Sequence, residues 1–288
     1  MDKRSPDMPV SLFRGIRLAT HLFYAVLLAI FYPHLNQTKR RRILKTWSRQ
    51  LLDILNIGIR TEGQWPVHGE GGYLVVANHV SWLDIFVLNA IYPSRFIAKA
   101  EVRNWPLIGW LCKRSNTIFI ERALRQDAAS INQRVSFLLK QGVCIGLFPE
   151  GTTTDGKQVG HFHSALIQPA IDAGAMLCPI ALRYQDENGK QSGAAAFTGD
   201  MTLSQSIWSI LRGPHFDVLL VFTPALVTVG ENRRVLARAA QEAISQGLQN
   251  VAGMRRVPEQ ETTSVIPQTL LSTQSGYAHQ LNQNLADD

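Results

Sequence analysis

Short apolar runs alternate along this chain with longer segments in which apolar residues recur at helical spacing. Apolar runs of this kind, bounded by turn residues, are typical of buried strands. Seven of them occur, at Ile57–Arg60, Tyr73–Ala77, Arg95–Ala98, Thr117–Ile120, Val143–Phe148, Leu177–Tyr184 and Asp217–Phe222. Helical stretches lie between or after them, at Trp82–Tyr92, Asp127–Gln141, Ser164–Ala173 and Arg233–Leu248. The pattern predicts an α/β fold with a mostly parallel sheet flanked by helices, and it leaves the strand order open.

The N-terminal end of the chain has a different pattern. Its most apolar stretch, Leu18–Tyr32, is closed by Pro33 and would form a helix of about 22 Å. That is shorter than the roughly 30 Å hydrocarbon core of a bilayer, so a transmembrane helix and a helix lying in the interface both remain open. A basic amphipathic helix follows, with Leu44, Trp47, Leu51 and Leu55 on one face. Helices of that type lie in the headgroup layer.

The net charge of +7 is concentrated in the same region. Residues 1–62 hold 11 Lys or Arg against 4 Asp or Glu, whereas residues 63–288 hold 18 of each. Nucleic-acid binding is disfavoured because the charges flank apolar residues and no nucleic-acid-binding motif is present. A cleaved signal peptide is disfavoured because Tyr32-Pro33-His34 and a tetrabasic run follow the apolar stretch. We therefore expect a membrane-associated helical segment at residues 1–56, with the following domain on the cytoplasmic side.

Two C-terminal segments have patterns of their own. Between Gln185 and Pro214, the apolar spacing of Leu203, Ile207, Ile210 and Leu211 predicts a helix that lies against the membrane or an acyl channel. Residues 251–288 are rich in Gln, Asn, Ser and Thr, which predicts a disordered tail.

The segment from Asn78 to Asp84 is the strongest candidate for catalytic chemistry. It directly follows the apolar run Tyr73–Ala77, so His79 stands where a strand ends and a helix begins, as active-site residues of α/β folds do. If Asp84 accepts a hydrogen bond from one imidazole nitrogen, the other nitrogen becomes a base of fixed tautomer and direction. A substrate that supplies its own hydroxyl then needs no Ser or Cys nucleophile. A His and an Asp five residues apart are common by chance, so the pair gains weight from its context.

Three further segments follow this pair in order. Glu121-Arg122 comes after one strand-like run, Phe148-Pro149-Glu150-Gly151-Thr152-Thr153 closes another, and Cys178–Leu182 lies in a third. Together with Asn78–Asp84, they resemble the four motifs of the glycerolipid acyltransferase family, which includes the 1-acylglycerol-3-phosphate acyltransferases. The stretch Phe96–Lys99 is also similar to the segment between that family's first two motifs. The resemblance implies an acyltransferase domain at residues 57–250.

The resemblance also implies roles for single residues. His79 and Asp84 match the catalytic pair, Arg122 matches a phosphate-contacting arginine, Glu150, Gly151 and Thr152 match the acceptor-binding loop, and Lys99 is a further substrate-binding residue. His79 would take the proton of the acceptor hydroxyl as that hydroxyl attacks an acyl thioester, and Asp84 would orient the imidazole. For Arg122, an ordinary surface ion pair is the alternative.

At two positions near the expected acceptor site, this chain departs from the residues that many phosphatidate-forming family members carry. Many phosphatidate-forming members carry Arg where this chain has Thr153 and Lys near the position of His163, so fixed positive charge is lost here. In this loop the chain resembles the branch that includes bacterial lyso-ornithine-lipid acyltransferases. The expected reaction moves a fatty acyl group from acyl-CoA or acyl carrier protein to a lysolipid, with 1-acyl-sn-glycerol-3-phosphate as acceptor and lyso-ornithine lipid or another lysolipid as the alternative.

Other classes of function are weighed against this one. A non-enzymatic membrane protein that binds lipid stays open as the alternative from another class. A hydrolase is disfavoured because no Gly-x-Ser-x-Gly nucleophile elbow occurs. Cys112, Cys144 and Cys178 are widely separated and indicate neither a disulfide framework nor a zinc site. His161-Phe162-His163 lacks further ligands nearby in the sequence, so we expect no metal and no tightly bound cofactor.

Overall fold

The computed structural model describes residues 8–65, 72–120 and 125–254. Its sheet has the strand order β1-β7-β6-β2-β5-β3-β4. The strands are β1 (Ile57–Glu62), β2 (Tyr73–Ala77), β3 (Arg95–Lys99), β4 (Ile118–Ile120), β5 (Ile145–Leu147), β6 (Met176–Gln185) and β7 (Phe216–Phe222). Neighbouring strands are parallel except β6 and β7, which are antiparallel. The predicted mostly parallel sheet and its seven strands are confirmed.

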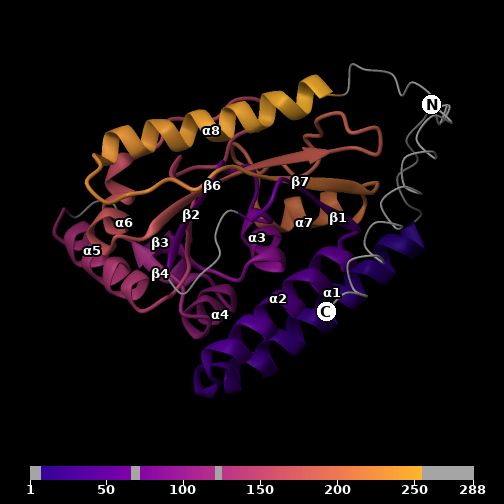
Figure 1. Cartoon of the computed structure of the whole chain (residues 1–288). Helices are drawn as coiled ribbons and strands as arrows, with labels where there is room; N and C mark the ends of the chain where they lie inside the picture. Colours follow the sequence, from indigo (N-terminus) through magenta and orange to yellow (C-terminus); the bar gives the residue numbers. More distant parts are fainter. Residues whose placement is uncertain (1–7, 66–71, 121–124, 255–288) are drawn as a thin grey trace, which may run out of the picture. The chain divides into compact units, whose positions relative to one another are not determined.

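Helices cover both faces of this sheet (Figure 1). One face carries α2 (Gln37–Ile54), α3 (Asp84–Ile91) and α7 (Leu203–Leu211), and the other carries α5 (Arg125–Lys140), α6 (Gln168–Ala173) and α8 (Arg233–Met254). The remaining helices are α1 (Met8–Phe31), α4 (Ile108–Arg114) and the 3-10 turns η1 (Tyr32–His34), η2 (Ala100–Asn104) and η3 (Ser164–Leu166).

Strand β2 shows why the apolar runs are continuous. Its residues are all buried, with Leu74 and Val76 in the core under α5 and α8, and Tyr73, Val75 and Ala77 in the core under α2 and α3. A parallel strand covered by helices on both faces has no polar side, so its sequence does not alternate. Because β2 lies between β5 and β6, the residues that follow it emerge near the middle of the sheet's carboxyl edge.

Helix α1 is longer than the sequence suggested. It runs over 24 residues, or about 36 Å, and the segment Met8–His34 is long and apolar enough to cross a bilayer by length and composition alone. The helix continues N-terminally through Arg14 and Arg17, which the apolar pattern could not include. Arg14 donates hydrogen bonds to the carbonyls of Leu211 and Gly213 at 3.4 and 3.3 Å, so its charge lies against the C-terminal end of α7.

Helix α2 belongs to the core of the sheet as well as to the basic N-terminal region. Leu51, Leu52 and Leu55 are at most 2% exposed and pack in the same cluster as β2 and α3. At the other end of the chain, α8 continues to Met254, beyond the predicted Leu248, so the first residues of the expected tail are helical. The tail from residue 255 onward lies outside the described residues.

The parallel strands bring several of the sequence motifs to one edge of the sheet. Strands β2, β5, β3 and β4 lie side by side and run in the same direction. Their carboxyl ends therefore share an edge, the usual place for an active site in an open α/β sheet.

Candidate active site

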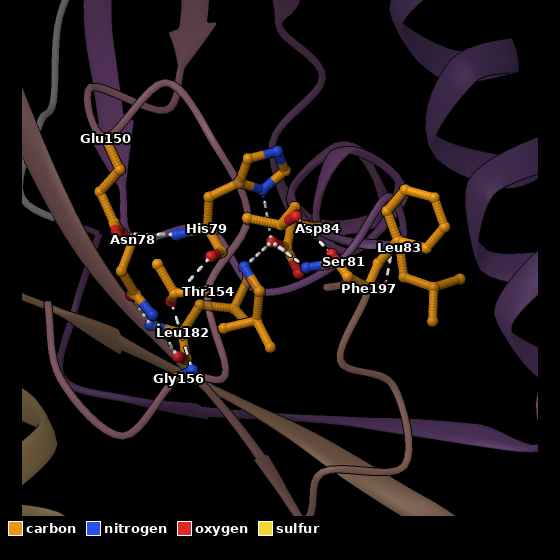
Figure 2. Close-up of polar contacts among 12 residues, drawn as sticks. Asn78, His79, Ser81, Leu83, Asp84, Glu150, Thr154, Gly156, Leu182 and Phe197 are labelled. Atoms are coloured by element: carbon orange, nitrogen blue, oxygen red, sulfur yellow. Dashed lines mark hydrogen bonds and ion pairs between the residues drawn. The ribbon is translucent and has the colours of Figure 1, made fainter. Parts of the chain in front are cut away.

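A His–Asp pair stands at this edge. His79 Nδ1 lies 2.8 Å from Asp84 Oδ2, and the connection spans the turn between β2 and α3 (Figure 2). The His79 side chain is 17% exposed, whereas that of Asp84 is fully buried. The second ring nitrogen, Nε2, has no hydrogen-bond partner within the described part of the chain, and in Figure 2 it points away from Asp84. Because the carboxylate accepts at Nδ1, Nε2 is left as the basic nitrogen.

The buried Asp84 carboxylate is surrounded by donors. The backbone N–H groups of Val80 and Ser81 donate to Oδ2 at 2.8 and 3.0 Å, in addition to the His79 ring. The Tyr184 hydroxyl donates to Oδ1 at 2.6 Å from strand β6. Four donors compensate the burial of this charge and fix the carboxylate in one orientation. Burial, followed by the negative charge of Asp84, raises the pKa of Tyr184, so the phenol remains a donor.

The His79 ring is also fixed by stacking. Phe148 lies parallel to it, with ring centroids 3.9 Å apart and an interplanar angle of 5°. Phe148 in turn stacks on Phe96 of β3, with centroids 5.6 Å apart. The imidazole is therefore held by Asp84 at one nitrogen and by an aromatic ring across its face.

Glu150 holds the backbone of His79 in place. Its Oε1 accepts the His79 N–H at 2.8 Å, and its Oε2 accepts the Gly160 N–H at 3.0 Å. The residue is 6% exposed. Burial raises the pKa of the Glu150 carboxyl, and the two backbone donors oppose that shift. The carboxylate thus joins the end of β2 to the loop that follows β5.

The same loop is tied down at two further threonines. The Thr154 N–H donates to the His79 carbonyl at 2.8 Å, and the Thr153 hydroxyl donates to the Phe197 carbonyl. The Thr153 hydroxyl is therefore engaged in a hydrogen bond within the protein, and this bond holds the segment before α7 against the loop. Gly151, between this pair and Glu150, has a φ of 74°, a conformation that glycine adopts without the cost a side chain would add.

The other expected site residues lie along the same edge or outside the described residues. Thr152 is exposed in the loop after β5, and Lys99 is exposed at the carboxyl end of β3. Two strand spacings separate Lys99 from the end of β2, which is roughly 10 Å across the sheet. Arg122 falls in residues 121–124, which the structure does not describe.

Comparisons with known proteins show the family of this chain. The profile of the family described as Acyltransferase matches residues 58–183. A lyso-ornithine lipid O-acyltransferase of Pseudomonas aeruginosa is 38% identical over 209 residues, which cover 73% of this chain and 79% of that protein. The chain belongs to the acyltransferase family.

Two further comparisons concern this acyltransferase. A 1-acyl-sn-glycerol-3-phosphate acyltransferase of Neisseria meningitidis serogroup B is also 38% identical, over 71% of this chain and 80% of that protein. The crystal structure of the 1-acyl-sn-glycerophosphate acyltransferase from Thermotoga maritima superposes with a TM-score of 0.60 at 21% identity, and the alignment covers 83% of this chain and 98% of that one. The latter likeness shows the same fold.

Sequence reasoning did not find two residues that position the site. Tyr184 reaches Asp84 from 100 residues away, and nothing in its local sequence marks it. Asn78 precedes His79 and bonds to the backbone N–H and carbonyl of Leu182 on β6 at 2.8 and 2.9 Å. The adjacency of Asn78 to the motif was visible, but its partner was not, because the strand order was open.

Within the residues described, no group of three or more His, Cys, Asp or Glu is placed to hold a metal ion. The rings of His161 and His163 lie 5.7 Å apart, centroid to centroid, and both residues are exposed.

Proposed function

We propose that this chain is a lysolipid O-acyltransferase that moves a fatty acyl group from an acyl thioester to 1-acyl-sn-glycerol-3-phosphate, giving phosphatidic acid. The observation that carries the proposal is the pair His79–Asp84, with Nε2 available at the carboxyl edge of the sheet. The acceptor brings its own hydroxyl, and a base within hydrogen-bond reach is what that hydroxyl needs in order to attack a thioester carbonyl.

The proposed mechanism assigns one step to each group. His79 Nε2 takes the proton of the acceptor hydroxyl while the oxygen bonds to the thioester carbonyl carbon. Asp84 stabilises the imidazolium that forms, and it is itself held by Val80, Ser81 and Tyr184. When the tetrahedral intermediate collapses, the carbon–sulfur bond breaks and the thiolate leaves with or without the proton held on His79. Acyl-CoA or acyl carrier protein is the donor, and the proposal needs no tightly bound cofactor.

Substrate binding is assigned to the loop after β5 and its neighbours. Glu150, Gly151 and Thr152 shape the acceptor site, and Lys99 supplies a cation along the same edge. Arg122, which lies outside the described residues, is assigned a second cationic contact from the family resemblance alone. The carboxylate of Glu150 already accepts two backbone donors, so its first effect is to set the position of His79.

A second acceptor, lyso-ornithine lipid, is favoured by one specific observation. Thr153 stands where a cation would serve a phosphomonoester, and its hydroxyl is bonded within the fold to Phe197. Relatives with both acceptors in their names are equally similar to this chain.

The test is an acyl-transfer assay with purified full-length protein. Labelled acyl-CoA and acyl carrier protein are offered with lysophosphatidate or lyso-ornithine lipid, and kcat/KM is compared for each pair. We expect transfer to lysophosphatidate that His79→Ala removes. Transfer to lyso-ornithine lipid alone would replace the acceptor, and binding of lipid without any transfer would favour a non-enzymatic lipid-binding protein.

Membrane association is proposed to occur in the interface at the cytoplasmic surface. The buried side of α1 includes Ser11, Leu18, His21, Ala25 and Ala29, which cover about 27 Å of helix. A helix that packs on the protein along this length cannot cross a bilayer unless the domain enters the bilayer too. The opposite side exposes large apolar residues, among them Phe13, Phe23 and Leu27, as an interfacial helix does. We retain residues 1–56 and 57–250 as a division of roles, membrane attachment and catalysis.

A further inference from the structure

A small recess, with a cavity volume of about 40 Å³, lies at the edge of the sheet opposite the His–Asp pair. Its wall includes Arg95, the first residue of β3, which is in register with the first residue of β5. Because β2, β3 and β5 are parallel, their amino ends are one strand length, roughly 16 Å, from the carboxyl edge that carries His79. Arg40 and Arg41 of α2 reach the recess from the other side. We call the recess formed around Arg40, Arg41 and Arg95 the arginine pocket.

The three arginines line the pocket without an acidic partner among the described residues. No Asp or Glu is among the described residues that line the arginine pocket, and no ion pair of its arginines occurs within the described part of the chain. Arg40 donates to the carbonyls of Tyr32 and Pro33 at 3.1 and 2.5 Å. Arg41 donates to Cys144 Sγ at 3.0 Å, which leaves most of its donors for another group.

Of the three arginines, Arg95 gives the strongest indication that the pocket binds an anion. It is half-buried, and no hydrogen bond to its guanidinium occurs among the described residues. Burial lowers the pKa of Arg95, and the positive charges of Arg40 and Arg134 lower it further. Like charges brought together and partly removed from water are unfavourable unless an anion joins them. The forked guanidinium suits the oxygens of a phosphate group.

The surroundings of the arginine pocket indicate what carries that phosphate. Tyr32, in its wall, directly follows α1, whose end exposes Ile30 and Phe31 at 43% and 64%. Ser115 and Asn116 directly follow α4, which exposes Trp110 at 36%. The pocket therefore lies where two helices with exposed apolar side chains end, and Figure 1 shows α4 beside the turn between α1 and α2.

We propose that the arginine pocket binds the phosphate of a membrane phospholipid whose acyl chains lie along the exposed faces of α1 and α4. The site is separate from the catalytic edge and does not depend on the proposed reaction. It would hold the protein at a fixed depth in the interface, because a lipid phosphate marks the level of the headgroups.

The test measures lipid retained by the full-length protein in native mass spectrometry after release from detergent micelles. The probe is phosphatidylglycerol, compared with a diacylglycerol of the same chains that lacks the phosphate. We expect the wild type to retain one phosphatidylglycerol and little diacylglycerol. Arg95→Gln and Arg41→Gln should each lower the bound fraction about tenfold, since each removes a charged donor to the phosphate.

The matched control is Arg42→Gln. Arg42 is exposed on the same helix, neighbours Arg41 in sequence and does not line the pocket, so the same loss of charge should leave retention near the wild-type level. Equal losses in Arg42→Gln and Arg95→Gln would show diffuse charge attraction and overturn the site. Equal retention of diacylglycerol would overturn recognition of the phosphate.

The melting temperature, measured with and without ligand, distinguishes binding of a lipid from binding of free phosphate and shows whether Arg95→Gln is folded. Arg95→Gln relieves repulsion, so without lipid its melting temperature should equal or exceed that of the wild type, and it should lose the rise that phosphatidylglycerol gives the wild type. Millimolar inorganic phosphate should give a much smaller rise than the lipid. A rise as large as the lipid's would overturn the lipid assignment. A fall in melting temperature for Arg95→Gln without lipid would show that Arg95 is structural and overturn its role in binding.

Discussion

At the scale of single residues, the site depends on which imidazole nitrogen is basic. Asp84 accepts a hydrogen bond from Nδ1 and is held there by two backbone donors and Tyr184, so the tautomer of His79 is set by buried groups. Stacking on Phe148 fixes the plane of the ring. The direction of Nε2 is therefore set by the fold itself, and in the proposed mechanism this would reduce the reorganisation needed in the transition state.

Removing the base should remove the reaction. We expect His79→Ala to lower kcat by at least 10² to 10⁴, the usual contribution of a general base, and Asp84→Asn to be severe because an amide can favour the wrong tautomer. Labelled acyl transfer at saturating lysolipid measures the effect, and thermal unfolding serves as the control for folding. A folded His79→Ala protein with wild-type turnover would contradict the proposed mechanism.

Tyr184→Phe separates positioning from direct catalysis. The substitution removes one donor from Asp84 Oδ1 and leaves the buried carboxylate short of a partner, which should cost about 1–3 kcal/mol of unfolding free energy. Asp84 should then orient the imidazole less well, so kcat should fall while the acceptor KM stays nearly unchanged. Steady-state kinetics and denaturant unfolding measure the two effects. Loss of stability with an unchanged kcat would show that Tyr184 is structural alone.

At the scale of elements, the proposed active site is a junction of three segments. The end of β2 supplies His79, the loop after β5 supplies Glu150 and Thr154, and β6 supplies Tyr184 and receives Asn78. Each connection passes between neighbouring strands of the sheet. Strand order is thus what converts motifs far apart in sequence into one site.

That dependence explains what the sequence could and could not predict. The seven strands were predictable because each contains a short apolar run, and the contact between His79 and Asp84 was predictable because it is local. The contact of Tyr184 requires knowing that β6 lies beside β2, and no local pattern encodes this. Helix α4 was not predicted because it is only seven residues long and Pro106 and Gly109 interrupt the region.

Glu150→Gln tests the junction between β2 and the loop after β5. The glutamine amide can accept one of the two backbone N–H groups, and its NH2 then faces the other. We expect kcat to fall about tenfold or more with the acceptor KM nearly unchanged, because the effect passes through the position of His79. Glu187→Gln, the same change at an exposed residue, should alter neither value. A rise in acceptor KM with kcat preserved would instead indicate direct contact of Glu150 with the acceptor hydroxyls.

At the scale of the whole molecule, exposed apolar residues and net positive charge occur in the same region, as expected for a protein that binds at a membrane interface. Helix α1 packs on α2, α4 and α7, and two of these neighbours also expose a large apolar side chain, Trp110 of α4 and Trp208 of α7. The net positive charge of the chain is concentrated in the same N-terminal part. Apolar contact and attraction to anionic headgroups therefore act on one part of the molecule, and salt should weaken the second without removing the first.

Phe23→Glu tests this orientation. Phe23 is 63% exposed on α1, so a charge there should leave the fold intact but place a carboxylate in the apolar layer. We expect binding to vesicles of phosphatidylglycerol and phosphatidylcholine to fall about tenfold or more, measured by flotation at low and high salt. The wild type should stay bound in high salt, whereas the variant, held mainly by its basic residues, should be released.

Phe137→Glu is the matched control because Phe137 is 62% exposed on α5, on the other face of the sheet. The two variants carry the same substitution at equal exposure, so they share any effect of added charge or lost apolar surface that is independent of location. Only Phe23→Glu should weaken vesicle binding if α1 enters the bilayer. Equal weakening by both variants would show that the membrane surface is not the side of α1 that Phe23 marks, and complete release of the wild type by salt would show that α1 does not enter the apolar layer.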